Sequence, residues 1–244
     1  MTAVHDEERL PPYRLRLSSR AKYVRLRILP GGELELVLPR HVDLAEGEAF
    51  LRSRVDWVER TRQRMGGPDG DRRLACREAP RRLCLAATAE TWRVRYVRCA
   101  GSRARLEEMG TGQLQIAGGE DDLAATRGLL REWLKRHARR VLPEWLEAVS
   151  RRTGLGYQRV TVRLQKTRWG SCSSRRNINL NAKLLFLPRE QVEYVLLHEL
   201  CHTRELNHSP AFWSLVQGHM PRARELDRKL RHAGRHVPPW IHCD

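Results

Sequence analysis

The chain has 244 residues, 41% of them hydrophobic, and a formal net charge of +17. This length allows one large domain or two small ones with a true core, and no apolar run is long enough to cross a bilayer. The charged start has no apolar signal segment, and the six scattered cysteines form no Cys-x-x-Cys pair, so we expect a cytoplasmic protein with reduced thiols and no membrane partner.

The first part of the chain predicts a β-hairpin followed by a helix. Over residues 13–39, apolar and polar side chains alternate on both sides of a Pro30-Gly31-Gly32 turn. Asp43 then opens an amphipathic helix with apolar residues at helical spacing, and the glycine-rich run 66–70 ends it. This part of the chain is therefore expected to be a small sheet with one helix.

Two further strands and a long helix are expected in the middle of the chain. The alternation of side chains over residues 92–96 and 114–116 predicts the strands. The helix is expected over residues 123–152 and to end at Gly154, because glycine is favoured just past a helix C-terminus. Pro143 lies inside it and is expected to kink or split it.

The last third of the chain predicts a second hairpin and further helices. Residues 160–164 and 178–182 alternate between apolar and polar side chains and predict two strands paired as a hairpin, with a turn-rich patch between them. Ser209-Pro210 is expected to start a helix whose aromatic side chains pack back on the preceding one. The tail from Pro238 is expected to be loosely ordered.

The helix that begins near Pro188 carries the sequence His198-Glu199-Leu-Cys-His202. Residues four apart share a helix face, so these two imidazoles can bind one metal ion, and zinc is the first expectation. Glu199 stands beside the first histidine, where it can take a proton from a metal-activated water. This is the His-Glu-x-x-His arrangement of zinc metallopeptidases. Because a histidine in an apolar stripe is costly unless it is bonded, the pattern favours a site over two surface histidines.

A third metal ligand is required, and His208 is the first candidate. It lies six residues past His202, the interval that metzincins use. Metzincins have a glycine between these two ligands, whereas this chain has Glu205, so we expect Asn207, which tolerates left-handed dihedrals, to help break the helix. Glu225 is the alternative third ligand, at a spacing known for other zincins.

These runs of residues resemble the YgjP-like metallopeptidase family, which is described as M48-like or SprT-like. The resemblance rests on Lys166-Thr-Arg-Trp169-Gly-Ser-Cys172-Ser, on Ile178-Asn-Leu-Asn181, on Glu193 through His202, and on Asn207-His208-Ser with Phe212-Trp213. It implies an α+β fold in which a zincin-like catalytic domain, with the active-site helix under a small sheet, follows a β-rich N-terminal region. We expect a β-rich region with one helix over residues 1–120 and the metallopeptidase domain over residues 121–244.

The resemblance also implies roles for individual residues. It makes His198, His202 and His208 the ligands of a Zn²⁺ ion and Glu199 the general base. Cys172 and Cys201 have no ligand role in this interpretation and are expected to be core thiols.

The leading hypothesis is therefore a zinc metallopeptidase that hydrolyses peptide bonds in protein or peptide substrates. A metal-dependent nucleotide phosphohydrolase is one alternative, which the arginine-rich surroundings would suit but no glycine-rich phosphate loop supports. A nucleic-acid-binding protein with a structural zinc is another, and it would need a fourth protein ligand.

The positive charge adds nucleic acid to the expected partners. Nearly all of it comes from arginines spread along the whole chain. A strong positive field attracts nucleic acid to a basic surface. A biased genome base composition produces the same excess of arginine, so the charge alone predicts only non-specific attraction.

Overall fold

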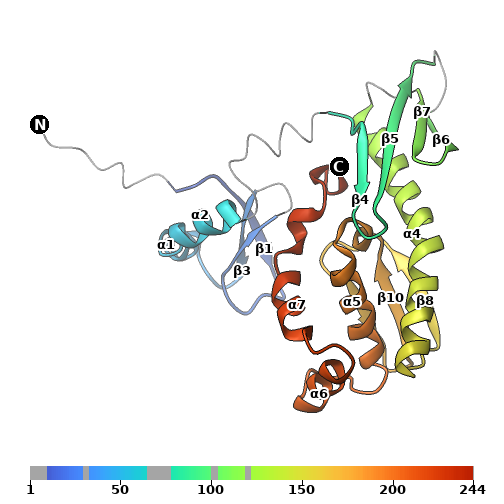
Figure 1. Cartoon of the computed structure of the whole chain (residues 1–244). Coiled ribbons are helices and arrows are strands. Elements are labelled where there is room, and N and C mark those ends of the chain that lie inside the picture. Colours follow the sequence, from blue (N-terminus) through green and yellow to red (C-terminus); the bar gives the residue numbers. More distant parts are fainter. Residues whose placement is uncertain (1–9, 30–32, 65–77, 100–103, 119–121, 244) are drawn as a thin grey trace, which may run out of the picture. The chain divides into compact units, whose positions relative to one another are not determined.

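The structure, a computed structural model, describes residues 10–29, 33–64, 78–99, 104–118 and 122–243 (Figure 1). The chain divides into two compact units, residues 1–77 and residues 78–244. Both units combine strands and helices, so the expected α+β class is confirmed. The glycine-rich runs at 30–32 and 66–70, predicted as a turn and a loop, lie outside the described residues.

The first unit contains a three-stranded sheet. Its strands are β1 (Tyr13–Ser18), β2 (Arg25–Ile28) and β3 (Leu34–Pro39), in the order β1-β3-β2. The antiparallel pairing of β2 with β3 confirms the predicted hairpin, and β1 adds to β3 in parallel. The central strand β3 is buried along its whole length, because both of its edges and its apolar face are covered.

Two short helices pack on this sheet where one helix was predicted. They are α1 (Leu44–Arg52) and α2 (Val55–Arg64). Asp43 is the N-cap of α1, as expected, and its carboxylate accepts a hydrogen bond from the Glu46 N–H at 2.7 Å. The helix ends early because Ser53 serves as the C-cap and its hydroxyl donates to the Phe50 carbonyl at 2.8 Å. Leu51 and Val58 still meet Leu34 in one apolar cluster.

The second unit begins with a four-stranded sheet. Its strands, in the order β4-β5-β7-β6, are β4 (Arg82–Leu85), β5 (Glu90–Val97), β6 (Arg105–Gly110) and β7 (Gln113–Ala117). Strands β5 and β7 contain the two alternating runs that predicted strands in this part of the chain. Leu83, Val94 and Ile116 point from this sheet into the main apolar core.

The long helix α4 (Leu123–Thr153) runs beside both sheets of the second unit (Figure 1). Asp122 caps its start, and Gly154 ends it in the left-handed region with φ of 67°. Pro143 was expected to kink or split the helix, and the split is wrong, because α4 is one helix through this residue. The kink stays a prediction. Buried leucines on both sides of Pro143, Leu142 and Leu146 among them, hold the helix against the core despite the lost hydrogen bond.

The hairpin predicted for residues 160–164 and 178–182 is wrong, because these strands belong to a three-stranded sheet with a different pairing. Its strands, in the order β8-β10-β9, are β8 (Arg159–Arg163), β9 (Gly170–Cys172) and β10 (Asn177–Asn181). Strands β8 and β10, expected to form the hairpin, are parallel, and β10 is antiparallel to β9. The turn-rich patch itself contains strand β9, which is the antiparallel partner of β10, whereas β8 lies on the other side of β10.

Helices complete the second unit around this sheet. They are η1 (Ala182–Phe186), α5 (Arg189–Cys201), α6 (Pro210–His219), α7 (Ala223–Leu230), η2 (Ala233–His236) and η3 (Pro239–Ile241). Ser209 caps α6 as expected, by accepting a hydrogen bond from the Phe212 N–H at 3.2 Å. The expectation of a loosely ordered tail is wrong, because Trp240 and Ile241 are buried and the Trp240 ring packs edge-on against Phe186.

The division of the chain differs from the expected boundary near residue 120. The four-stranded sheet lies in the second unit, because its apolar face and α4 share one core. A compact unit is not by itself a domain, so the boundary at residue 120 stays a prediction.

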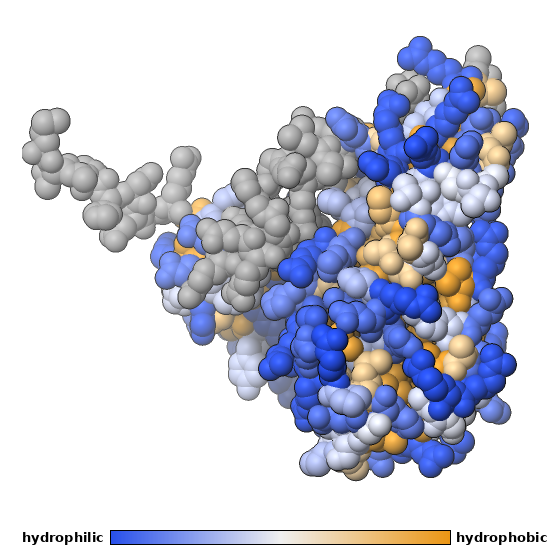
Figure 2. Space-filling view, viewed as in Figure 1, coloured by the Kyte–Doolittle hydropathy of each residue, from blue (hydrophilic) through white to orange (hydrophobic). Residues whose placement is uncertain are grey.

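The surface and the cysteines complete the description. Hydrophilic residues cover most of the visible face in Figure 2, and hydrophobic residues gather there only in small patches. In the described part of the chain, no helix combines the length and apolar character needed to span a bilayer. The thiols of Cys84, Cys99, Cys172 and Cys201 are free, whereas Cys243 is disulfide-bonded, so the expectation of reduced thiols is wrong there.

Candidate metal centre

Helix α5 positions the first half of the site. The helix lies in the core, with Val195, Leu196 and Leu200 buried, and it ends at Cys201 with His202 as its C-cap. His198 and His202 thus lie one turn apart on one side of the helix, as the spacing predicted. Glu199 is 6% exposed, and burial of this kind is expensive for a carboxylate without a role.

A compact turn after α5 returns the chain to the site at His208. The N–H groups of Arg204 and Glu205 donate to the Cys201 carbonyl at 3.0 and 2.9 Å, which closes the last turn of the helix. Among the described residues other than glycine, only Ala89 and Arg176 have positive φ. The break before His208 is therefore present but does not use a left-handed Asn207.

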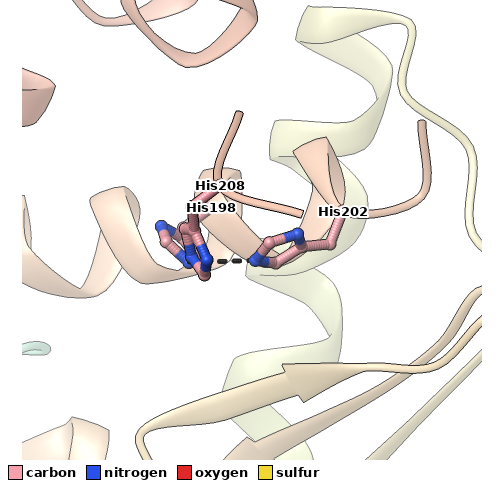
Figure 3. A group of neighbouring side chains, drawn as sticks. All are labelled: His198, His202 and His208. Atoms are coloured by element: carbon pink, nitrogen blue, oxygen red, sulfur yellow. Dashed lines mark hydrogen bonds between the residues drawn. The ribbon is translucent and has the colours of Figure 1, made fainter. Parts of the chain in front are cut away.

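The three histidines converge (Figure 3). The Nε2 atom of His198 lies 3.2 Å from that of His202 and 3.0 Å from that of His208, and the candidate ligand atoms of all three lie within 4.8 Å of one another. Two ligands of a tetrahedral zinc ion at about 2.0–2.1 Å are themselves about 3.3 Å apart. The cluster therefore has the spacing that such an ion requires.

Hydrogen bonds to the far sides of two rings set their tautomers. The hydroxyl of Tyr194 donates to Asp227 at 3.1 Å, so at 3.2 Å it can only accept from Nδ1–H of His198. The Nδ1 atom of His202 lies 2.8 Å from the Glu205 carbonyl, which only accepts. Both rings therefore carry their proton on Nδ1 and turn an Nε2 lone pair toward the cluster, as metal-binding histidines do.

The rings are also held in their neutral form. Burial lowers the pKa of His198 to about 3, with the neighbouring His202 and His208 lowering it further. Burial likewise lowers the pKa of His202. Neutral imidazole is the form that binds metal, so at neutral pH these two rings need lose no proton to become ligands.

An apolar ring lies against the cluster on one side. The Phe212 ring of α6 is stacked on His202 at 4.5 Å between centroids and meets His198 and His208 edge-on at 5.0 and 4.8 Å. Trp213 lies 6.3 Å from His208, and the Arg224 guanidinium sits 3.7 Å over the Trp213 ring. Helix α6 thus packs back on α5 as expected, and it also shapes the histidine cluster.

Glu199 lies between α5 and strand β9. A Cβ atom added to Gly170 would be only 2.6 Å from its Oε1 atom, so the strand approaches the carboxylate as closely as a glycine allows. Its Oε2 atom is buried and has no hydrogen-bond partner among the described residues. Burial raises the pKa of Glu199 to about 8, and the positive charge of Arg168 opposes the rise.

The alternative ligand Glu225 is engaged elsewhere. Its carboxylate accepts hydrogen bonds from Arg222 at 3.0 Å and pairs with Lys229 at 2.9 Å. These two cations hold the pKa of Glu225 at about 2. In the described part of the chain, the group that could hold a metal consists of His198, His202 and His208 and does not include Glu225. The geometry therefore favours His208 as the third ligand.

Several residues of the site were not found from the sequence. Tyr194 stands four residues before His198, so helical spacing alone could have placed it beside this ring. Asp227 and Gly170 reach the site from α7 and β9, and nothing in their local sequence marks them. The two cysteines of the motifs behave as expected of thiols without a ligand role, since burial raises the pKa of Cys172 to about 11 and that of Cys201 to about 12.

Comparison with known proteins gives a family match and similar solved structures. A family model described as YgjP-like, metallopeptidase domain, matches residues 22–233. The metallopeptidase zymogen abylysin of Pyrococcus abyssi is 28% identical, with 37% of this chain and 91% of that chain covered and a TM-score of 0.34. The metallopeptidase zymogen jannalysin of Methanocaldococcus jannaschii is 18% identical, with 36% and 92% covered and a TM-score of 0.33. The comparison with curated proteins gives no match.

Proposed function

The chain belongs to the YgjP-like metallopeptidase family, and from that premise we propose that it hydrolyses peptide bonds with a zinc ion held by His198, His202 and His208. The observation that carries the proposal is the convergence of three imidazoles beside a buried carboxylate, Glu199, whose Oε2 atom has no hydrogen-bond partner in the described part of the chain. Zinc suits this set because imidazole is one of its preferred ligands.

The donor set supports a catalytic ion over a structural one. A structural zinc site is closed by four protein ligands, whereas a catalytic site has three and leaves a position open. The candidate group offers three ligand atoms within the described residues. When bound, zinc supplies a Lewis acid that acidifies water and polarises a carbonyl group.

Glu199 is proposed as the general base. It neighbours His198 in the helix and is held against β9, which fixes where its carboxylate can reach. Its Oε2 atom has no hydrogen-bond partner among the described residues, so this oxygen is available to accept a proton. It would take a proton from the attacking water and pass it to the leaving amine.

The substrate is proposed to be an extended segment of a protein or peptide. Within the described residues, strand β9 is at the edge of its sheet and pairs only with β10. An extended chain can add to such an edge by main-chain hydrogen bonds. Because Gly170 of β9 lies against Glu199, a segment added there would pass directly beside the proposed base.

A cytoplasmic location and a nucleic-acid partner are also proposed. Four free thiols in the described part of the chain support a reducing compartment, whereas the disulfide bond of Cys243 is evidence against one. The net charge of +17 supports a polyanionic partner in addition to the substrate.

The substitution Glu199→Gln tests the proposed mechanism. We expect the variant to bind zinc like the parent, because the three imidazoles are unchanged, and to lose about 100-fold or more of its activity on an unfolded protein substrate. Zinc content by mass spectrometry and the rate of peptide release are the two measurements. Glu190→Gln, an exposed glutamate on the same helix, is the matched control and should keep both.

Three results would contradict the proposal. An active Glu199→Gln variant would show that the base is another group. If Glu225→Ala lost its zinc and His208→Ala kept it, the third ligand would be Glu225 and not His208. A parent protein that hydrolyses nucleotides and leaves denatured protein intact would favour the phosphohydrolase.

A further inference from the structure

The first unit separates its charges. Strands β1 and β2 and the segment between them, residues 13–28, carry six basic side chains and no acidic one: Arg14, Arg16, Arg20, Lys22, Arg25 and Arg27. The segment 43–64, which forms α1 and α2, carries five acidic residues and five arginines, so its net charge is zero. A bias spread evenly along the chain would not concentrate the positive charge in the two strands in this way.

The strand register gathers four of these arginines on one face of the sheet. Arg14 of β1 and Arg27 of β2 both stand opposite Glu35 of β3, and Arg16 and Arg25 both stand opposite Val37. Residues opposite one another in a sheet point to the same side. We call this set of Arg14, Arg16, Arg25 and Arg27 around Glu35 the arginine face.

The opposite face of the same sheet is apolar, and it is covered along the central strand β3, whereas Leu15 and Leu17 of β1 are exposed. Leu34, Leu36 and Leu38 alternate with the residues of the arginine face along β3. A Cβ atom added to Gly47 of α1 would meet the side chains of Leu36 and Leu38. Packing of the helices on that side leaves the arginines on the other.

The arginines are exposed and incompletely neutralised. The side chains of Arg16 and Arg27 are 56% and 50% exposed, and both lie near Glu35 Oε2, at 3.8 and 3.6 Å. Arg14 and Arg25 are exposed as well, and within the described residues the ion pairs of this face involve only Arg16 and Arg27. Four positive charges thus surround one carboxylate, which leaves three in excess.

We propose that the arginine face binds the phosphate backbone of single-stranded nucleic acid. Alternate residues of a strand are about 6.7 Å apart and the two outer strands about 9.6 Å apart, so the face presents guanidinium groups in a regular array. Guanidinium matches the oxygens of a phosphate in bidentate geometry. Tyr23, which is 73% exposed between β1 and β2, offers a ring on which a base can stack.

This binding is independent of the proposed peptidase activity, because the arginine face and the histidine cluster lie in different units. A failure of one proposal therefore leaves the other standing. The experiment uses the full chain and a fluorescent oligothymidylate, with binding followed by anisotropy over a series of salt concentrations.

The test variant replaces Arg14, Arg16, Arg25 and Arg27 by glutamine. Each phosphate contact contributes about 0.7 to the slope of log affinity against log salt for a single strand, so the slope should fall by about 3 and the affinity by at least tenfold. The matched control removes four exposed arginines of the second unit, Arg136, Arg139, Arg151 and Arg228, and should bind nearly as the parent does. Circular dichroism spectra and calorimetric transitions like those of the parent would show that both variants are folded.

The conservative variant Glu35→Gln tests the same face in the opposite direction. It removes the one carboxylate among the four arginines, so we expect severalfold tighter binding. Equal losses in the test and control variants would overturn the proposal, because attraction would then follow net charge alone. It would also be overturned if the parent bound polyglutamate or a DNA duplex as tightly as the single strand.

Discussion

At the scale of single residues, Tyr194 connects the candidate ligand His198 to helix α7. Its hydroxyl accepts from Nδ1 of the histidine and donates to Asp227, which also pairs with Arg231 at 3.2 Å. Groups of this kind orient a ligand and raise its basicity without touching the metal. Burial and the neighbouring Asp227 raise the pKa of Tyr194, so the hydroxyl keeps its proton.

We expect Tyr194→Phe to weaken zinc binding about 10- to 100-fold, because the ring of His198 loses the group that fixes its tautomer. Competition with a chromophoric chelator measures the affinity directly and does not depend on activity. Tyr157→Phe is the matched control, since it also removes a hydroxyl bonded to a glutamate, Glu147, outside the histidine cluster. Equal affinities in the parent and Tyr194→Phe would show that this hydroxyl does not support the ligand.

Some contacts of the candidate site could be predicted from the sequence, and others could not. The spacing of His198, His202 and His208 predicted their convergence, because helical geometry is local and short turns have few solutions. The contacts of Gly170 with Glu199 and of Phe212 with all three rings could not be predicted. They depend on how distant elements pack, and a single sequence contains no signal for such contacts.

At the scale of elements, α4 is tied to the four-stranded sheet by a polar and aromatic network. Nε2 of His137 lies 2.9 Å from Glu90, and Arg140 pairs with Glu108 at 3.1 Å. The His137 ring is also stacked on Trp133 at 5.3 Å. Burial lowers the pKa of His137, and Glu90 only partly opposes this.

This network predicts a loss of stability in mild acid. His137 has a lower pKa in the folded protein than in the unfolded chain, so the unfolded chain binds the proton first. Its contribution is present above about pH 6.5 and is lost as the pH falls below that value. In urea unfolding at several pH values with chelator present, His137→Gln should show a shallower loss of unfolding free energy than the parent.

The exposed histidine His219 provides the control for this series, since His219→Gln should follow the parent at every pH. Parallel curves for the parent and His137→Gln would mean that the ring titrates alike in the folded and unfolded chain.

Most elements were correctly predicted as helices or strands, but the pairing of the strands β8, β9 and β10 was not. The alternation of side chains located β5, β7, β8 and β10, because a half-buried strand has a period of two. Strand β9 is three residues long within a run of glycine and serine, so no period could reveal it. Without it, β8 and β10 were paired as neighbours in sequence, although they are parallel.

At the scale of the whole molecule, the candidate metal centre lies entirely in the second unit. A ligand that binds only the folded state stabilises it by RT ln(1 + [L]/Kd), or about 2.7 kcal/mol at a hundredfold excess over Kd. In calorimetry we therefore expect zinc to raise the melting temperature of one transition, that of the second unit. Because six of the seven tryptophans lie in residues 78–244, the same shift should appear in tryptophan fluorescence.

The first unit provides an internal reference for this measurement. Its melting temperature should be the same with zinc and with chelator, and His202→Ala should abolish the shift in the second unit. If calorimetry showed one transition, and zinc shifted it as a whole, the two units would unfold together.

The contact of Phe212 with the three imidazoles has a consequence for how the enzyme behaves when its metal ion is in short supply. The Phe212 ring packs against the three rings by van der Waals contact, and this contact does not depend on a bound ion. We therefore expect the emptied pocket to keep its shape and to refill without refolding. A cell starved of zinc would then hold a reserve of intact enzyme, and activity would return as fast as the ion arrives instead of waiting for new synthesis.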